Sequence, residues 1–598
     1  MSAFANGAQV KGFKRTKDPV VRAVLEWLQG CDLPALLPEF APGADQHERQ
    51  LLAGLGSIAS ALSKVGGGGG EVPAEVLQWW SAPNQPPASL VGGLIDRMDD
   101  QHDVLVEIYT SIVCPDSRRK MGTFFTPDAL TQFALAKCGE NEITPQAVVD
   151  PGAGVGAFTL AAAEQWHTPV VAVDLNAVTL GLLAARCHYE GYETTADFDS
   201  GSRSGRRSVQ LLRTDFLTWV TTEFESLPSP SLIIGNPPYT RHQGLDPKTK
   251  RIARDAAGHL VSSGLAGMAA YFLAASLRSI RPGDALCLLL PGSWMQACYG
   301  RELREHLWGL DRPVDLAVFP NDLLVFPRTN VDAVMLFVGP TSKCKGPLIV
   351  SNPSLHNATV HRDDPVEIVR TGSAPPSFPR DKGGWTPPRR IEESLGDSFR
   401  VRRGIATGCN RFFLLTDEEV RIHQIPSRCL QPGITKVQAI EGDVLDECAM
   451  EALGKANEKR WILRLSHRDE RGARIGAYLA RGHQDGVADG FLASQREHWF
   501  VIDEDVKPAP LLVLPMTKRS FRVILNTAGA LHTNTLYGLY PKNASVDVDR
   551  AAEWLRGSHG QQAMRKVARH YSSGLLKLEP RTLSTLPVPP DFALAPGA

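Results

Sequence analysis

Residues 147–158 read Ala-Val-Val-Asp-Pro-Gly-Ala-Gly-Val-Gly-Ala-Phe and carry the clearest sign of fold class in the chain. The short apolar run predicts a buried strand that ends at Asp150. Gly152, Gly154 and Gly156 then predict a tight turn, in which a ligand approaches the backbone closely because no side chain intervenes. Their spacing is G-x-G-x-G, which differs from the G-x-G-x-x-G of dinucleotide-binding folds. The stretch therefore predicts a ligand-binding turn between a strand and a helix.

Short apolar segments alternate with helical patterns along the chain that follows. The expected strands cover residues 147–149, 170–173, 210–212, 232–234, 285–290 and 334–338. Helical patterns at 160–166, 178–189 and 266–280 lie between several of them. This alternation favours an α/β fold with a doubly wound parallel sheet, in which ligands bind where the loops leave the carboxyl ends of the strands.

The overall composition excludes several classes of protein. The 598 residues include 64 Lys and Arg against 65 Asp and Glu, a formal net charge of −1, which excludes a wholly basic DNA-coating protein. The 10 cysteines form no C-x-x-C pair, so a zinc ribbon is not expected. The apolar runs are much shorter than the roughly 20 residues of a membrane span, and residues 1–20 lack an apolar signal-peptide core. We therefore expect a cytoplasmic protein with no membrane partner.

The chain divides by pattern into four parts. Residues 1–110 have apolar positions at helical spacing and predict a helical region without catalytic residues, interrupted by a flexible run at Gly66–Gly70. Residues 111–345 hold the α/β pattern, and residues 346–395, rich in Pro, Ser and Gly, predict a linker. Residues 396–598 predict a separate mixed α/β domain with local basic clusters.

Acidic side chains follow three successive strands of the predicted sheet. Asp174 ends the second strand, where a carboxylate accepts hydrogen bonds from both hydroxyls of a ribose. Asp215 ends the third strand as a candidate acceptor for an adenine amino group, and Phe216 is a candidate to pack on the ring. A single aspartate at a strand end more often caps a helix. Three of them in register, Asp150 included, predict a nucleoside-binding pocket.

The motif Asn236-Pro237-Pro238-Tyr239 follows a further strand and predicts the site of chemistry. An exocyclic amine on an aromatic ring is a poor nucleophile, because its lone pair is delocalised into the ring. The amide oxygen of Asn236 and the rigidly held carbonyl oxygen of Pro237 offer two acceptors for the amino hydrogens. They favour a pyramidal nitrogen whose lone pair points at an electrophile, while Tyr239 stacks on the ring. Taken alone, Asn-Pro-Pro is as readily a turn after a buried strand.

The strand-end aspartates and the Asn-Pro-Pro-Tyr motif have the spacing of the class I S-adenosylmethionine-dependent methyltransferases, which this region resembles. The segment Gly122-Thr-Phe-Phe-Thr126-Pro127 precedes the glycine turn, and this order resembles the gamma class of N6-adenine DNA methyltransferases. The TaqI-type and Eco57I-type enzymes are the most similar. The resemblance covers about residues 105–345. It implies a Rossmann-like sheet and S-adenosylmethionine as cofactor.

The resemblance also implies roles for single residues. The cofactor-binding residues that it implies are Thr126, against the methionine part, with Asp150, Gly152, Gly154, Asp174, Asp215 and Phe216. The catalytic motif Asn236, Pro237, Pro238 and Tyr239 would hold the target adenine. Residues 325–331 resemble a loop whose phenylalanine stacks on the flipped base, which implies that role for Phe326.

The last domain resembles the target-recognition domain of TaqI-type enzymes at both ends. Residues 403–410 read Arg-Gly-Ile-Ala-Thr-Gly-Cys-Asn, and residues 583–589 read Leu-Ser-Thr-Leu-Pro-Val-Pro. The resemblance implies double-stranded DNA as the partner, with basic side chains on phosphates and polar side chains on base edges. The candidate DNA contacts are Arg402, Arg403, Asn410, Lys518 and Arg519. Because N6 of a stacked adenine is out of reach, the base must rotate out of the duplex.

Other functions compete with this one. Methylation of cytosine C5 needs a cysteine after a proline, and the chain has no Pro-Cys pair. Glutamine methyltransferases share Asn-Pro-Pro-Tyr but are much shorter. An RNA-base methyltransferase and a non-catalytic DNA-binding subunit with the same fold are left open.

The expected chemistry implies no metal, because the sulfonium of the cofactor is the electrophile. Residues 1–105 show no Asp…Glu-x-Lys nuclease cluster, so we expect modification without cleavage. The protein partner left open is a cognate restriction endonuclease or a subunit of a phage-defence system.

Overall fold

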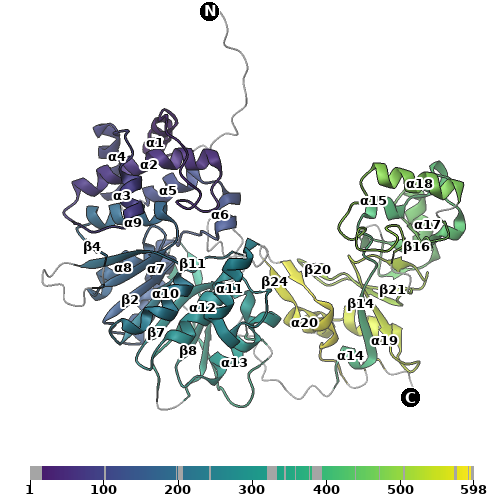
Figure 1. Ribbon diagram of the computed structural model, residues 1–598. Coiled ribbons are helices and arrows are strands. Elements are labelled where there is room, and N and C mark those ends of the chain that lie inside the picture. The colour runs from purple at the N-terminus through teal and green to yellow at the C-terminus, as the bar shows by residue number, and fades with distance from the viewer. Residues whose placement is uncertain are drawn as a thin grey trace, which may run out of the picture. The chain divides into compact units, whose positions relative to one another are not determined.

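The computed structural model describes residues 16–593 apart from 100–102, 197, 199–206, 241–243, 320–332, 343–344, 357–358, 362, 376, 380–392, 438–439, 470–471, 503–505, 572–574 and 590–591. The chain divides into two compact units between Trp385 and Thr386. Within the described residues, the first unit holds one large sheet and a hairpin, and the second unit holds three smaller sheets (Figure 1).

The large sheet has the strand order β1-β4-β5-β3-β2-β6-β7-β9-β8-β10-β13. Its middle strands are β2 (Ala147–Pro151), β3 (Val170–Asp174), β5 (Ser208–Arg213), β6 (Ser231–Gly235), β7 (Ala285–Pro291), β8 (Val314–Val318) and β9 (Ala333–Val338). Neighbouring strands are parallel from β1 to β7. The chain leaves β2 toward β3 and β5 on one side and returns to β6 on the other. This switch in strand order marks where ligands bind in doubly wound sheets.

Alternate residues of the strands face two cores, one on each side of the sheet. Val149 and Ile233 pack with α10 (Phe216–Thr222), α11 (Pro247–Ala257) and α12 (Met268–Ser279), which Figure 1 shows side by side. Val148 and Leu232 pack with α7 (Asp128–Glu140), α8 (Ala157–Trp166) and α9 (Ala177–Tyr189). The strands are apolar on both faces because helices cover both faces. The α/β prediction and its Rossmann-like sheet are confirmed.

Two features of this sheet depart from the sequence prediction. Strand β9 is antiparallel to β7 and to β8, so the sheet is mixed rather than wholly parallel. Strand β8 was not predicted, because its sequence Val-Asp-Leu-Ala-Val places the acidic Asp315 in the run. Asp315 is nevertheless buried, and it forms an ion pair with Lys137 of α7. A buried charge with a partner does not interrupt a strand.

The chain before the sheet forms α1 (Pro19–Gln29), α2 (Gln46–Val65), α3 (Ala74–Trp80), α4 (Ala88–Asp99), α5 (Val104–Ile112) and α6 (Pro115–Met121). Figure 1 shows α1 to α5 grouped next to α9. The apolar sides of α1 to α5 share one core with Ala177, Val178 and Leu182 of α9. Residue 110 is therefore not a boundary between compact units. The outward side of α9 is apolar, and these helices keep it from water.

The glycine run at Gly66–Gly70 is not the flexible break that its composition predicts. It contains β1 (Gly69–Gly70), which pairs with β4 (Glu193–Thr195) at one edge of the large sheet. A Cβ at Gly66 would lie 2.1 Å from the carbonyl oxygen of His188, and one at Gly68 would lie 2.3 Å from that of Tyr192. Glycine is needed here because two backbones approach each other too closely for a side chain.

The expected linker at 346–395 is wrong for residues 348–356, 359–361 and 363–368. Strand β10 (Leu348–Ser351) pairs with β8, and β13 (Val366–Ile368) pairs with β10, so both extend the large sheet. Between them, β11 (Ser354–His356) and β12 (Thr359–His361) form a hairpin. Short edge strands joined by turns have the Pro, Ser and Gly content that otherwise indicates a linker.

The second unit is a mixed α/β structure, as expected. Its sheets have the orders β14-β23-β19-β21-β17, β15-β18-β16-β22 and β20-β25-β24. The strands are β14 (Phe399–Arg403), β15 (Leu414–Leu415), β16 (Leu430–Ile434), β17 (Val444–Leu445), β18 (Trp461–Leu463), β19 (Leu511–Val513), β20 (Met516–Thr517), β21 (Val523–Asn526), β22 (Leu531–His532), β23 (Tyr537–Pro541), β24 (Arg569–Tyr571) and β25 (Leu575–Lys577). The longer helices are α17 (Glu447–Lys455), α18 (Ala473–Gln484), α19 (Val548–Arg556) and α20 (Ser558–Val567).

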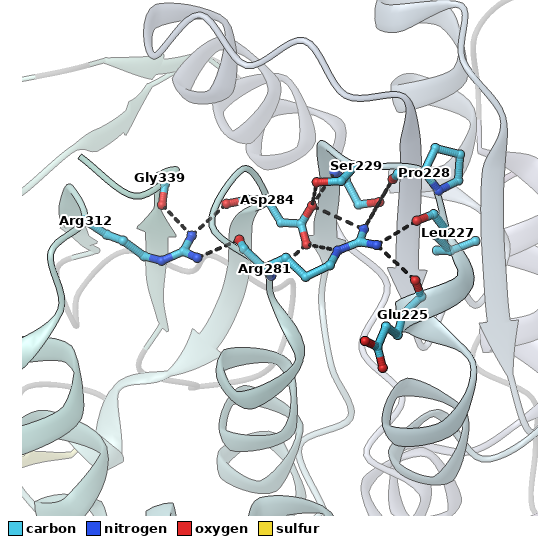
Figure 2. Close-up of polar contacts among 9 residues, drawn as sticks. Glu225, Leu227, Pro228, Ser229, Arg281, Asp284, Arg312 and Gly339 are labelled. Atoms are coloured by element: carbon cyan, nitrogen blue, oxygen red, sulfur yellow. Dashed lines mark hydrogen bonds and ion pairs between the residues drawn. The ribbon is translucent and has the colours of Figure 1, made fainter. Parts of the chain in front are cut away.

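An arginine network ties the strands together at the edge of the large sheet where β6 and β7 begin (Figure 2). The fully buried carboxylate of Asp284 accepts hydrogen bonds from the Ser231 backbone at 2.7 Å and from Arg281 at 2.8 Å. Burial alone would raise the pKa of Asp284, but these bonds outweigh burial and hold the pKa below its usual value. Arg312 donates to the carbonyl oxygens of Asp284 and Gly339. The network fixes the ends at which these strands begin and leaves their carboxyl ends for ligands.

Candidate active site

The glycine turn is held against the end of β3 by backbone hydrogen bonds. The N–H of Gly152 donates to the carbonyl oxygen of Val173 at 2.8 Å, and the N–H of Gly154 donates to the Asp174 carboxylate at 2.7 Å. Gly152, Gly154 and Gly156 have φ of +77°, +57° and +89°, a conformation that favours glycine. The tight turn predicted from the spacing is present.

A cavity of about 200 Å³ lies over this turn, and parts of the chain that are far apart in sequence enclose it. Its described lining includes Thr126, Asp150, Gly152, Gly154, Asp174, Asp215, Phe216, Asn236 and Pro238. The structure therefore brings the predicted cofactor residues and the first residue of the Asn-Pro-Pro-Tyr motif to one cavity.

The lining of the cavity is acidic. Asp103, Asp150, Asp174 and Asp215 contribute carboxyl groups, and Lys, Arg and His are absent from the described residues of the lining. The phosphates of a dinucleotide would be repelled there, whereas a ligand that carries positive charge is favoured.

Asp150 is a buried carboxyl group beneath the glycine turn. Its Oδ2 atom accepts a hydrogen bond from the Thr159 hydroxyl at 2.7 Å. Burial raises the pKa of Asp150 to about 7, although the Thr159 bond opposes the rise. A Cβ at Gly235 would lie 2.7 Å from Oδ1 of Asp150, so the carboxyl group also packs against the end of β6. Asp150 thus joins the turn to the strand that leads to Asn236.

Asp174 lies at the end of β3, where the sequence predicted a ribose acceptor. Its Oδ2 atom accepts from the Gly154 N–H at 2.7 Å and its Oδ1 atom accepts from the Asn176 N–H at 2.8 Å. Burial raises the pKa of Asp174 despite these two bonds. Each carboxylate oxygen has further lone pairs, so the group supports the turn and still has acceptors for ribose hydroxyls.

Asp215 and Phe216 lie where β5 passes into α10. The Oδ2 atom of Asp215 caps α10 by accepting from the Thr218 N–H at 3.2 Å and from its hydroxyl at 2.8 Å. This cap does not use Oδ1, which can serve a ligand. The Phe216 ring is buried and stacks on Phe272 with a centroid distance of 4.9 Å, and both rings line the cavity. They form an apolar surface suited to one face of a purine.

Asn236 presents an acceptor without a partner. Its Nδ2 atom donates to the carbonyl oxygen of Phe124 at 3.0 Å and to the hydroxyl oxygen of Thr126 at 3.1 Å. Its Oδ1 atom is buried and accepts no hydrogen bond from the described residues. Buried polar atoms in native proteins are nearly always hydrogen-bonded, so this oxygen indicates a site for a donor.

The rest of the motif supports this turn. Pro238 lines the cavity. Pro237 is buried, and neither Pro237 nor Tyr239 belongs to the described lining. The Tyr239 hydroxyl donates to the carbonyl oxygen of Leu289 at 3.2 Å, and the Tyr239 ring lies 5.2 Å from that of Phe124. Burial raises the pKa of Tyr239 well above its usual value, so the phenol keeps its proton. The stacking of Tyr239 on a base stays a prediction. The contacts with Leu289 and Phe124 hold the Tyr239 ring in place.

The N-terminal helices supply a wall of the cavity that the sequence did not predict. Pro42, Asp103 and Val106 line it. Asn176, which caps α9, donates from Nδ2 to the Tyr109 hydroxyl oxygen at 3.1 Å. The helical spacing of residues 1–110 is the same whether a helix packs on a core or borders a pocket, so no signal in the sequence marked these residues.

In the second unit, two candidate DNA contacts make internal bonds. The Asn410 amide oxygen accepts from the Thr407 hydroxyl at 2.6 Å, and its Nδ2 atom donates to the Thr435 hydroxyl at 3.4 Å. Arg403 forms an ion pair with Glu579 at 2.9 Å. Asn410 therefore holds its own loop together, a role that the motif alone did not reveal.

Basic residues lie next to β20, at the end of α20 and at the start of β24, and we refer to them together as the basic face. We define it as Lys518, Arg519, Arg565, Lys566 and Arg569, of which the first four are exposed. Arg565 donates to the carbonyl oxygen of Arg519, so the two ends of the basic face are in contact. This surface brings the predicted Lys518 and Arg519 together with basic residues about 50 positions later in the chain. Arg402 is exposed on β14.

Some expectations fall outside these observations. Phe326 lies outside the described residues. Among the residues that the structure describes, His, Cys, Asp and Glu form no cluster with the arrangement of a metal site. In the same part of the chain, each helix is too short or too polar to cross a membrane.

Comparison with known families identifies the chain. Residues 229–326 match the family model of the Eco57I restriction-modification methylases, and residues 389–596 match that of the C-terminal domain of the Type II methyltransferase M.Eco57I. The chain is an Eco57I-type restriction–modification methyltransferase. The first match begins just before β6 and includes the Asn-Pro-Pro-Tyr turn, and the second covers the second unit.

Individual relatives of this Eco57I-type methyltransferase are also named as methyltransferases. It is 26% identical over 488 residues to the Type II methyltransferase M.XamI of Xanthomonas campestris pv. amaranthicola, covering 79% of this chain and 85% of the relative. It is 20% identical over 504 residues to M.AccI of Acinetobacter calcoaceticus, covering 80% and 86%. A solved structure of the Type IIL restriction-modification enzyme MmeI in complex with DNA has a similar fold. The TM-score is 0.54 and the identity is 13%, over 95% of this chain and 84% of that one.

Proposed function

We propose that this Eco57I-type methyltransferase transfers the methyl group of S-adenosylmethionine to N6 of an adenine rotated out of double-stranded DNA. The observation that carries the proposal concerns the buried Oδ1 atom of Asn236, a residue in the lining of the cavity over the glycine turn. This atom accepts no hydrogen bond from the part of the chain that the structure describes. An amino group is the donor that this oxygen lacks. The choice of adenine rests on the resemblance of the whole motif order to the gamma class.

The residues of the cavity fit the proposed cofactor. S-adenosylmethionine carries a positive sulfonium and a positive ammonium group, which suit a lining with four aspartates. We assign the ribose hydroxyls to Asp174 and the cofactor's adenine to Asp215 and Phe216. When bound, the cofactor supplies an electrophilic methyl carbon.

The chain's own part in the reaction is to orient and polarise the target amine. The Asn236 Oδ1 atom and the Pro237 carbonyl oxygen each accept a hydrogen bond from one N–H of the target amine. These two bonds favour a pyramidal nitrogen whose lone pair is no longer conjugated with the ring. Positive charge develops on the nitrogen as the new bond forms. The same two oxygens stabilise this charge, which makes their contribution larger in the transition state than in the ground state.

Double-stranded DNA is the proposed substrate. The basic face of the second unit offers cations for phosphates, and M.XamI and M.AccI are Type II methyltransferases. Extrusion of the adenine costs a few kcal/mol. Stacking on an aromatic ring such as that of Tyr239 is worth about 1–3 kcal/mol per base and offsets part of this cost.

Transfer of label from tritiated S-adenosylmethionine to DNA tests the proposal. After digestion to nucleosides, we expect label in N6-methyladenine for the wild type and none for Asn236→Ala at an unchanged melting temperature. Label in another nucleoside, or activity that survives Asn236→Ala, would refute the proposed chemistry. Label in RNA alone would favour an RNA-base methyltransferase. DNA binding without any transfer would favour the non-catalytic subunit.

We further propose a cognate restriction endonuclease as the protein partner, because residues 229–326 match a family of restriction-modification methylases. Sequencing modified bases in a host that expresses the chain would give the recognition sequence. DNA from that host should then resist the endonuclease. Cleavage of the fully modified sites would exclude this partner.

A further inference from the structure

The side-chain amide of Asn236 can adopt two orientations of nearly the same shape, related by a half turn that exchanges oxygen and nitrogen. Only one of them presents an acceptor to an amine. The Phe124 carbonyl group, which can only accept, receives a hydrogen bond from Nδ2 at 3.0 Å. In the reversed orientation two oxygens would face each other there. The Phe124 carbonyl thus selects the orientation that leaves Oδ1 for a ligand.

The hydrogen bond to Phe124 alone does not fix the plane of the Asn236 amide, because the amide can rotate about this hydrogen bond without breaking it. The second hydrogen of Nδ2 points to the hydroxyl oxygen of Thr126 at 3.1 Å. Thr126 is buried, with 9% of its surface exposed, so water does not easily replace its hydroxyl. The two acceptors together satisfy Nδ2 and hold the amide plane.

We infer that Thr126 is a positioning residue for the target amine, and that it acts through Asn236. This inference rests on the proposed function, and it extends the role of Thr126 beyond the cofactor contact that the family resemblance implies. The segment 122–126 also contacts the other end of the motif, because the Tyr239 N–H donates to the carbonyl oxygen of Gly122 at 3.1 Å. Residues 122–126 therefore brace both Asn236 and Tyr239.

Two substitutions separate this role from cofactor binding. Thr126→Val keeps the shape of the side chain and removes the hydroxyl, whereas Thr126→Ser keeps the hydroxyl. The matched control is Thr131→Val in α7, since Thr131 is buried and its hydroxyl has no hydrogen-bond partner within the described part of the chain. The readouts are the single-turnover methylation rate at saturating cofactor and the dissociation constant for S-adenosylmethionine measured by equilibrium dialysis.

We expect Thr126→Val to lower the single-turnover rate by about 10- to 100-fold, as for other small displacements of reacting groups. The cofactor dissociation constant should change less than about twofold, and Thr126→Ser should recover most of the rate. If the valine variant does not fold, Thr126→Ala takes its place. A weaker cofactor complex with an unchanged rate at saturation would overturn the inference, as would equal rates for Thr126→Val and Thr131→Val. Activity that survives Asn236→Ala would refute the proposed function itself, and that outcome is distinct from any result for Thr126.

Discussion

Replacing Gly122 with alanine tests whether residues 122–126 hold the Asn-Pro-Pro-Tyr turn in place. Gly122 has φ of +73°, and an added Cβ would lie 2.7 Å from the backbone nitrogens of Tyr239 and Thr240 and 2.6 Å from the Thr240 hydroxyl. These separations are several tenths of an ångström too short for van der Waals contact. Since two of the three atoms are backbone, the turn itself must move rather than a side chain.

Two effects of different size follow from this geometry. Alanine in the left-handed region costs about 1–2 kcal/mol of stability. A shift of the catalytic turn that approaches an ångström lowers the transfer rate by roughly 100-fold. Gly191 provides the matched control, because its φ is +85° and an added Cβ would meet no described atom within 4 Å. Gly191→Ala therefore carries the strain without the displacement.

The assay is single-turnover DNA methylation at saturating cofactor, with thermal melting measured in parallel. Both variants should melt at a lowered temperature, Gly122→Ala the lower of the two because its clash adds to the strain, and only Gly122→Ala should lose most of its rate. Equal methylation rates for Gly122→Ala and Gly191→Ala would show that the segment does not hold the turn.

Three further predictions concern other parts of the chain. The raised pKa of Asp150, about 7, means that the native state keeps a proton that the unfolded state loses above about pH 4, so stability falls as the pH rises toward 7. Thermal melting should accordingly show Asp150→Asn gaining on the wild type between pH 4 and pH 7, and a pH-independent difference would contradict this. Asp284→Ala leaves Arg281 without its ion-pair partner and should lower the free energy of unfolding by about 3 kcal/mol in denaturant melts, while methylation at room temperature is retained. Removing the charges of Lys518 and Arg519 should reduce the slope of log binding constant against log salt by about 0.9 per lost phosphate contact, measured by anisotropy on cognate and unrelated DNA; an unchanged slope would exclude phosphate contacts here.

Local signals were sufficient to predict the centre of the fold. Strands β2, β3, β6 and β7 are short apolar runs, and the turn after β2 needs the backbone conformation of glycine at Gly152, Gly154 and Gly156. Asp174 ends β3 and Asp215 lies two residues after β5, so the direction of the two parallel strands places both at the same end of the sheet. These features depend on a few neighbouring residues, and a sequence displays such neighbours.

Features that depend on distant partners were not predictable in the same way. The glycine run at Gly66–Gly70 looks like a flexible segment, until the backbone of residues 188–194 is found against it. The same holds for Asn410, whose amide is occupied by Thr407 and Thr435. The contact of Thr126 with Asn236 joins residues 110 positions apart. No spacing rule connects them.

The wall that Pro42, Asp103 and Val106 add to the cavity has a practical meaning for dissecting this chain. A fragment trimmed to the recognisable motifs, from residue 111 onward, would keep every motif residue yet lose one side of the ligand cavity. It would also expose the apolar back of α9 to solvent and invite aggregation. A minimal catalytic fragment must therefore start ahead of α1, and any attempt to transplant the chemistry onto another scaffold must carry these helices with it.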